Sequence, residues 1–299
     1  MRLLITDLDN TLYDWVSYFA TAFQAMVKQL AVLLSVDEET LRDQFKRVHQ
    51  QHENSEQPFA IFELPAVHAH FGDLSNADLY QRLREPLNAF RSAREESLRL
   101  YPSVSETLRE LWELGVVVVG YTEAMAELAY QRLELLGILP FFSHLYALDG
   151  KLEPHPDPDR NLRRLASPPD FLTYIHRDKR KPNPALLQAI CSKELISPSQ
   201  ACYVGDSLIR DVAMAKAAGL TAVWARYGTN YPADLWQVVV RVTHWTDKDV
   251  LRESELRELF HDTRPDYTVD SFGDLIGLFE HADSRSAGDV AAVHPADVA

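Results

Sequence analysis

The feature that most constrains the fold is an apolar segment near the start of the chain that two carboxylates follow at once. Leu3, Leu4 and Ile5 form the apolar run, and Asp7 and Asp9 come directly after it. A strand buried on both faces has such a continuous run and belongs to a parallel sheet. Ligands of open α/β sheets bind beyond the carboxyl ends of these strands. The segment therefore predicts a parallel α/β sheet with both carboxylates at its ligand-binding edge.

The same segment allows two simpler interpretations. An Asx-rich turn could lead from the strand into a helix, with Asp9 or Thr11 as its N-cap, and the segment alone does not decide against this. A calcium loop of the EF-hand type is excluded, because that loop needs glycine at its sixth position and glutamate at its twelfth. The chain has Leu12 and Tyr18 there.

Composition limits the classes of partner. The 299 residues include 30 basic and 44 acidic side chains, a formal charge of −14, so we expect no nucleic-acid partner and a local positive site for any anionic substrate. The two cysteines are too few for a disulfide framework and indicate a reducing compartment. No signal-peptide pattern or membrane-spanning run is evident. We expect a cytoplasmic protein without a membrane partner, as a monomer or homodimer.

From residue 101 onward, helical patterns alternate with short apolar runs. The runs lie at 116–119, 145–148, 201–204 and 221–225. Repeated strand–helix units favour a parallel sheet. We therefore expect a Rossmann-like core from residues 1–14 and 101–281.

The remaining segments are expected to be insertions or a tail. Residues 15–100 contain no convincing strand and show helical spacing, which predicts a helical cap domain. Two inserts of irregular or mixed character are expected within the core, at about 150–180 and 229–263. Residues 282–299 are expected to form a flexible tail.

Polar residues also follow or precede the later predicted elements. Thr122 and Glu123 come after the second apolar run, Lys181 precedes a helix that begins near Pro184, and Asp206 and Asp211 follow the run at 201–204. Each site alone is weak, because a threonine after a strand is usually a cap and Gly-Asp-Ser is often a turn. Their order, and their fit to the Asp pair, carry the signal.

In this order the sites resemble the four motifs of the haloacid dehalogenase (HAD) superfamily, specifically its phosphatase branch. The resemblance covers residues 1–14 and 101–225, whereas the segment between them matches the family's helical cap only in position and type. It implies a Rossmann-like core with a mobile cap, and a Mg²⁺-dependent phosphomonoesterase that acts on a small-molecule phosphate ester through an aspartyl-phosphate. The residues that carry the motifs are Asp7 and Asp9, Thr122, Lys181, and Asp206 with Asp211.

The resemblance also implies a role for each catalytic residue. Asp7 attacks phosphorus, and Asp9 protonates the leaving oxygen and then deprotonates the water that clears the intermediate. Thr122, Glu123 and Lys181 would bind the phosphate, through a hydroxyl, backbone N–H groups and an ammonium.

The implied cofactor is Mg²⁺. Carboxylates gathered around a phosphate dianion repel one another, each close pair by about 4 kcal/mol at ~4 Å and intermediate dielectric, so a cation is needed. Carboxylates of Asp7 and Asp206 with the backbone carbonyl of Asp9 would form part of the oxygen shell that Mg²⁺ prefers. Asp211 would ligate directly or through water.

The substrate is less constrained than the chemistry. The string Asn10-Thr11-Leu12-Tyr13 is similar to pyrimidine 5'-nucleotidase-like members, which suggests a nucleoside 5'-monophosphate. A sugar-phosphate or phosphoglycolate phosphatase is the alternative, and a non-catalytic scaffold or regulatory protein on the same fold is the alternative of another class. A dehalogenase would not need Asp9, and a phosphonate hydrolase would want a cap lysine, where only Lys28 and Lys46 are available.

Three further details bear on the site. Asn10 stands where many family members carry glycine, and asparagine tolerates the positive φ that this turn would require. Aromatic residues after the catalytic loop could stack on a base or sugar, although core packing is their commoner role. Arginines of the cap could meet a second anionic group, although arginine in a polar helix is usually solvated. These arginines are Arg82, Arg84, Arg91 and Arg94.

Overall fold

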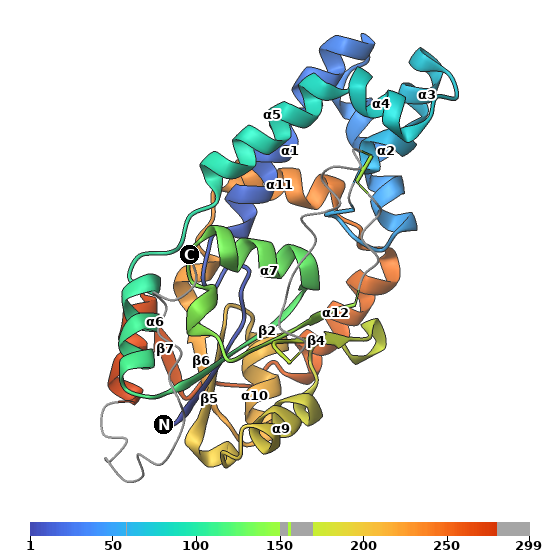
Figure 1. Ribbon diagram of the computed structural model, residues 1–299. Helices are drawn as coiled ribbons and strands as arrows, with labels where there is room; N and C mark the ends of the chain where they lie inside the picture. Colours follow the sequence, from blue (N-terminus) through green and yellow to red (C-terminus); the bar gives the residue numbers. More distant parts are fainter. Residues whose placement is uncertain (58, 150–154, 157–169, 280–299) are drawn as a thin grey trace.

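A seven-stranded parallel sheet forms the centre of the molecule (Figure 1). The computed structural model describes residues 1–57, 59–149, 155–156 and 170–279. In these ranges the strand order is β4-β3-β2-β1-β5-β6-β7, and all neighbours run parallel. The predicted α/β class with a Rossmann-like sheet is confirmed. The strands are β1 (Leu3–Thr6), β2 (Val117–Met125), β3 (His144–Leu148), β4 (Leu172–Ile175), β5 (Ala201–Gly205), β6 (Thr221–Ala225) and β7 (Tyr267–Val269).

The first strand lies at the middle of the sheet, between β2 and β5. All four of its residues are buried, as its apolar run predicts. Its side chains alternate between two apolar clusters, one on each face of the sheet. Leu4 packs on one face with α6 (Val104–Glu113) and α7 (Ala126–Leu135), and Ile5 packs on the other face with α9 (Pro184–Lys193) and α10 (Ala213–Ala218). Asp7 therefore emerges at the carboxyl edge of a fully covered strand.

Short helical turns connect the sheet elements. Because β1 pairs in parallel with β2 and β5, the loops after these three strands lie at one edge of the sheet. The turns are η2 (Leu139–Phe141), η3 (Arg177–Lys179), η4 (Pro198–Gln200), η5 (Leu208–Val212), η6 (Arg226–Thr229) and η7 (Phe272–Leu278).

A group of helices stands above the carboxyl edge of the sheet, and we call α1 to α5 the cap helices (Figure 1). The first begins after Asp14, whose side chain accepts a hydrogen bond from the Ser17 N–H, and its apolar stripe is buried against α5. No single helix in the described ranges is long and apolar enough to cross a bilayer, and α1 with α2 meets that test only as a pair bent by 117°. The cap helices are α1 (Trp15–Leu34), α2 (Glu38–Gln51), η1 (Ala60–Glu63), α3 (Pro65–Phe71), α4 (Asn76–Arg82) and α5 (Arg84–Ser97).

The first insert is less irregular than expected. Residues 172–175 form the edge strand β4, which pairs with β3. The sequence did not reveal this strand because an edge strand has one partner, and the half-buried Thr173 and the exposed Tyr174 interrupt the buried apolar pattern. Residues 150–154 and 157–169 of this insert, and the tail at 282–299, lie outside the described residues.

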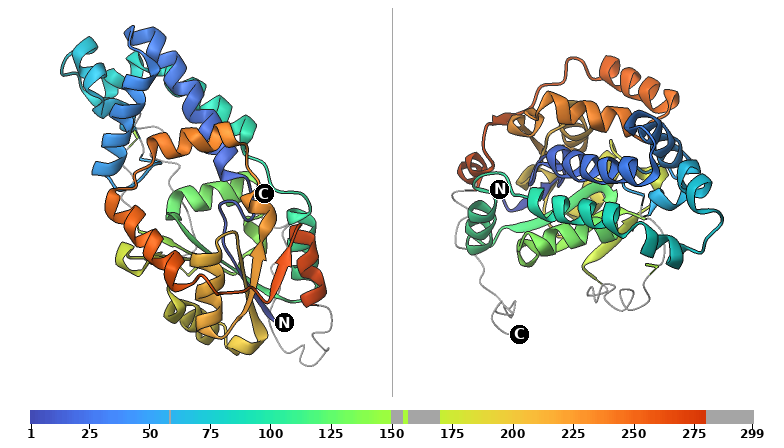
Figure 2. Two further views of the ribbon diagram at one scale, coloured as in Figure 1. Left: turned by 180° about the vertical axis from the view of Figure 1, so that it is seen from behind. Right: turned by 90° about the horizontal axis from the view of Figure 1, so that it is seen from above.

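The second insert, expected to be of mixed character, consists largely of two helices, α11 (Ala233–Val242) and α12 (Asp247–Leu259). Helix α11 packs on α1 and α2, and Figure 2 shows it lying beside α1. The His49 Nδ1–H donates to the Val242 carbonyl at 2.7 Å, and the Gln50 amide donates to the Trp245 carbonyl at 3.0 Å. The second insert therefore contacts the cap helices. Its position in the sequence, between β6 and β7, did not indicate this contact.

Candidate active site

A buried lysine links two carboxylates at the carboxyl edge of the sheet. The Lys181 ammonium lies 2.8 Å from Asp7 Oδ1 and 2.9 Å from Asp211 Oδ1, and its side chain is 3% exposed. It also lies 5.1 and 5.4 Å from the ring centres of Tyr121 and Tyr203. Although burial disfavours the ammonium, the two carboxylates raise the pKa of Lys181. The lysine is therefore a fixed positive charge beside Asp7.

Asp211 is held on both of its oxygens. Its Oδ1 accepts from Lys181 and from the Tyr203 hydroxyl, the latter at 2.9 Å, and its Oδ2 accepts from the Ser207 backbone N–H at 3.0 Å. A Cβ on Gly205 would lie 2.4 Å from this carboxylate, so only glycine permits the approach. Asp211 is positioned by its neighbours more tightly than a freely rotating metal ligand would be.

Three carboxylates form an acidic cluster at this edge. One oxygen each from Asp7, Asp206 and Asp211 lie within 4.8 Å of one another, the one such group of His, Cys, Asp or Glu in the described ranges. Burial raises the pKa of Asp7 to about 7, with Asp211 adding to the rise and Lys181 opposing it. Burial and the neighbouring carboxylates also raise the pKa of Asp206. One lysine does not balance these charges, and the all-oxygen donor set fits Mg²⁺.

Asp9 points to a different partner. Its Oδ1 accepts from the Arg132 Nη1 at 2.9 Å, and the Arg132 Nη2 donates to Glu56, which follows α2 in the cap segment. The Arg132 guanidinium is 2% exposed and lies over the rings of Tyr13 and Tyr18. Burial raises the pKa of Asp9, while Arg132 lowers it. Arg132 thus links Asp9, the second aspartate of the first motif, to the cap segment.

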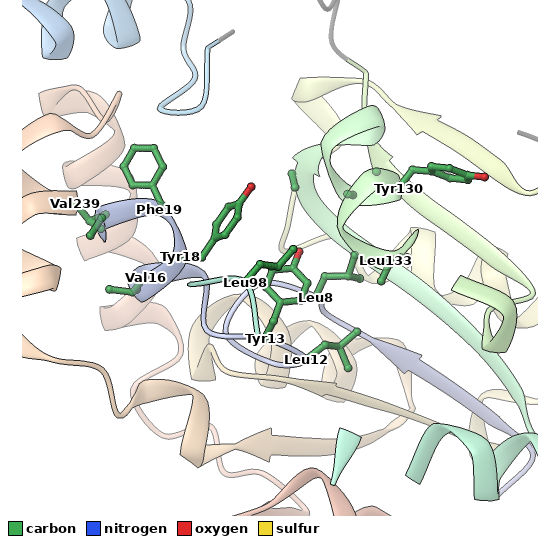
Figure 3. Close-up of a cluster of buried hydrophobic side chains, with 14 of the residues drawn as sticks. Leu8, Leu12, Tyr13, Val16, Tyr18, Phe19, Leu98, Tyr130, Leu133 and Val239 are labelled. Carbon is green, nitrogen blue, oxygen red and sulfur yellow. The ribbon is translucent and has the colours of Figure 1, made fainter. Parts of the chain in front are cut away.

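Figure 3 shows the two tyrosines whose rings Arg132 contacts. Tyr13 and Tyr18 stand between the ribbon of α1 and that of α7, next to Leu8 and Leu98. Arg132 and Glu56 were not among the site residues expected from the sequence. The available signal was a charge on the face of α7 that also carries Ala129 and Leu133, which are buried.

Thr122 and Glu123 occupy the end of β2. The Thr122 side chain is buried, and its hydroxyl accepts from the Ala124 N–H at 3.1 Å. The Glu123 carboxylate accepts from the Lys181 backbone N–H at 3.0 Å and from Arg210 at 3.1 Å. The Glu123 side chain therefore supports the loop that contains Lys181. Only the backbone N–H of Glu123 is then left to bind a phosphate.

Asn10 adopts the positive φ that its position was expected to require. Its φ is 55°, and its side-chain oxygen accepts from the N–H groups of Trp15 and Val16 at 3.1 and 3.3 Å. A Cβ on Gly228 would lie 1.8 Å from the Asn10 carbonyl oxygen, so the loop after β6 packs tightly on this turn. The turn is thereby fixed on both sides.

These features define a class of protein: a parallel α/β sheet with an acidic cluster and a buried lysine at its carboxyl edge, beneath a group of helices. The model of the family described as haloacid dehalogenase-like hydrolase matches residues 1–219, and a HAD-hydrolase-like model matches residues 179–275. The chain belongs to the haloacid dehalogenase-like hydrolases. The recognition from the motifs, a hydrolase of the phosphatase branch, is confirmed.

Curated relatives and solved structures agree with this family. A phosphoglycolate phosphatase of Vibrio parahaemolyticus is 28% identical over 77% of this chain and 86% of its own length. One of Pseudomonas putida is 28% identical over 77% of this chain and 71% of its own length.

Among solved structures, a 2-haloacid dehalogenase from Pseudomonas syringae pv. Tomato covers 93% of this chain and 98% of its own, at 18% identity and a TM-score of 0.53. A HAD phosphatase from Thermococcus onnurineus covers 94% and 98%, at 18% identity and a TM-score of 0.51. At this identity the two structures show the shared fold.

Proposed function

We propose that this protein is a Mg²⁺-dependent phosphomonoesterase that forms an aspartyl-phosphate on Asp7. The observation that carries the proposal is the placement of the Asp7 carboxylate at 2.8 Å from the Lys181 ammonium, within the acidic cluster. Asp7, Asp206 and the Asp9 carbonyl would hold the ion, and Asp211 would position Lys181 and, through water, the ion. When bound, Mg²⁺ supplies positive charge against the phosphate oxygens.

The residues of the chain divide the two steps between them. In the first step an Asp7 oxygen bonds to phosphorus, the bond to the leaving oxygen breaks, and Asp9 gives that oxygen a proton. In the second step Asp9 takes a proton from a water whose oxygen bonds to phosphorus, and the bond to Asp7 breaks. The Thr122 hydroxyl and Lys181 bind the phosphate oxygens. Arg132 fixes the position of the Asp9 carboxylate.

We also propose that residues 15–100 act as a cap over a core of residues 1–14 and 101–281. The support is the position of the cap helices above the carboxyl edge of the sheet (Figure 1), and the ion pair by which Glu56 reaches Arg132. Substrate selection beyond the phosphate would then fall to the cap.

The names of the relatives favour phosphoglycolate over a nucleoside 5'-monophosphate as the substrate. They are phosphoglycolate phosphatases, whereas the nucleoside 5'-monophosphate rests on the short string at residues 10–13. Phosphoglycolate is therefore the better-supported of the two, and a sugar phosphate remains in the same class.

The test is phosphate release from a panel of esters with Mg²⁺, with the Asp7→Asn variant as background. The panel contains 2-phosphoglycolate, a sugar phosphate and a nucleoside 5'-monophosphate. Release by the unaltered chain that the variant lacks supports the proposal. A purified, folded chain that releases phosphate from no ester would reject it in favour of a scaffold.

A further inference from the structure

A cavity of about 360 Å³ lies among the cap helices, and the proposed function does not use it. Its walls come from α1, α2, η1, α4 and α5, from the segment between α2 and η1, from Leu128 and Gln131 of α7, and from His155. The volume falls in the range of about 300–1,000 Å³ that is typical of sites for drug-sized ligands. A third of the lining residues are phenylalanines or tyrosines, among them Phe19, Phe23, Phe45, Phe59, Tyr80 and Phe90.

The cavity begins close to the proposed proton donor. Glu56 and Tyr18 both line it, and both contact Arg132, Glu56 by an ion pair and Tyr18 by its ring at 5.1 Å. Arg132 in turn donates to Asp9 at 2.9 Å. Figure 3 shows Tyr18 at this junction of cap and core. Asp9 itself does not line the cavity, and the Arg132 side chain links the two. Because Asp9 meets the leaving oxygen in the proposed mechanism, the cavity lies on the side of Asp9 toward which the leaving group would point.

The charge of the cavity wall is positive. Glu56 is the acidic residue among those that line the cavity, and its charge is paired with Arg132. Arg91 and Arg94 of α5 also line the cavity. Arg91 donates to the Asn88 amide oxygen and Arg94 lies over the Phe90 ring, and in the described part of the chain neither arginine pairs with a carboxylate. Two cations beside an aromatic wall suit an apolar body that carries an anionic group.

We propose that this cavity binds the leaving group, and that the substrate is the phosphate ester of a bulky alcohol with an aromatic body and a carboxylate or similar anionic group. The proposal rests on the proposed phosphomonoesterase activity and differs from the phosphoglycolate that the names of the relatives favour. The two-carbon glycolate would leave most of the aromatic wall without contacts. A leaving group that covers the wall would gain its apolar contacts and an ion pair with an arginine.

Three primary-alcohol phosphates test the proposal: ethyl phosphate, 2-phenylethyl phosphate, and the same phenylethyl ester with a para-carboxylate. Their leaving alcohols are similar in acidity, so differences in kcat/KM report binding of the body. We expect kcat/KM with Mg²⁺ to rise at least about tenfold from ethyl to phenylethyl. We expect a further severalfold rise with the carboxylate.

Two variants and one control assign these gains to the cavity. Ala60→Phe fills the space and should remove the gain from the phenyl ring, whereas Arg94→Gln, at a half-buried site that tolerates glutamine, should remove only the gain from the carboxylate. Val32→Phe makes a similar change on the exposed face of α1, where Val32 is 76% exposed, and should change neither gain. Equal kcat/KM for the ethyl and phenylethyl esters, or a uniform loss for all three esters in Ala60→Phe, would overturn the proposal.

A binding measurement separates this proposal from the proposed function. Calorimetry with the Asp7→Asn variant compares 2-phenylethyl phosphate with ethyl phosphate in the absence of turnover. Tighter binding of the phenylethyl ester that Ala60→Phe abolishes supports the cavity even if no ester is hydrolysed. Equal binding of the two esters counts against the cavity, even if phosphate release establishes the enzyme.

Discussion

The Arg132 guanidinium bridges Asp9 and Glu56, with its Nη1 at 2.9 Å from Asp9 Oδ1 and its Nη2 against the Glu56 carboxylate. One end of this bridge, Asp9, lies in the loop after β1, and the other end, Glu56, lies in the segment after α2. The position of Asp9, the proposed proton donor, therefore depends on the position of the cap segment relative to the core.

Loss of Arg132 should slow the step that needs a proton. In Arg132→Gln, Asp9 loses its anchor, so we expect kcat for ethyl phosphate to fall by about 10²-fold or more. The fall should be much smaller for p-nitrophenyl phosphate, whose leaving group needs no proton. Arg132→Lys, which keeps the charge, should recover part of the loss. Equal losses with both esters would show a merely structural role for Arg132.

Removal of the metal should silence the enzyme. Excess chelator should abolish phosphate release, and added Mg²⁺ should restore it, because the acidic cluster carries more negative charge than Lys181 balances. Mg²⁺ should also raise the Tm of the unaltered chain, but not that of Asp206→Asn. Undiminished turnover in excess chelator would remove the ion from the mechanism.

The contact between α2 and the second insert should weaken in acid. Burial lowers the pKa of His49 from 6.5 to about 4, so below pH 6.5 the unfolded chain binds a proton that the folded chain does not. The contribution of His49 to the free energy of unfolding is therefore fully present above pH 6.5 and is lost as the pH falls toward 4. This group alone should cost about 2 kcal/mol at pH 5, and urea unfolding at pH 7 and pH 5 measures it.

The comparison for this prediction uses His49→Asn. The asparagine amide can still donate to the Val242 carbonyl but does not titrate, so the loss between pH 7 and pH 5 should shrink. His68→Asn, at an exposed position on α3, should leave the loss unchanged. The same loss in all three proteins would show that His49 does not carry it.

The residues at the carboxyl edge of the sheet could be predicted from the sequence better than the helices and strands that surround this edge. A fully buried strand has a recognisable apolar run, so β1 and the placement of Asp7 at its end could be predicted from residues 3–9. Asn10 could be assigned its positive φ because it stands where many family members carry glycine, and asparagine tolerates that conformation. The first prediction depends on local chemistry alone, and the second also on the resemblance to the family.

Features that depend on distant contacts could not be predicted. The pairing of Arg132 with Asp9 joins residues 123 positions apart. The position of Arg132 on the buried face of α7 could indicate a buried charge but not its partner. The packing of α11 on α1 and α2 depends equally on tertiary contacts. Strand β4 could not be predicted because an edge strand carries a weak pattern. The cavity in the cap helices arises from all of these placements together.

The role of Asp7 as the nucleophile can be tested by trapping the covalent intermediate. A phosphate ester labelled with ³²P is mixed with Mg²⁺ and the protein, the reaction is quenched in acid within one turnover, and the labelled peptide is identified by mass spectrometry. The account predicts label on the peptide that contains Asp7, and none with a folded Asp7→Asn variant. Label on another residue, or turnover by Asp7→Asn at more than a few per cent of the unaltered rate, would contradict it.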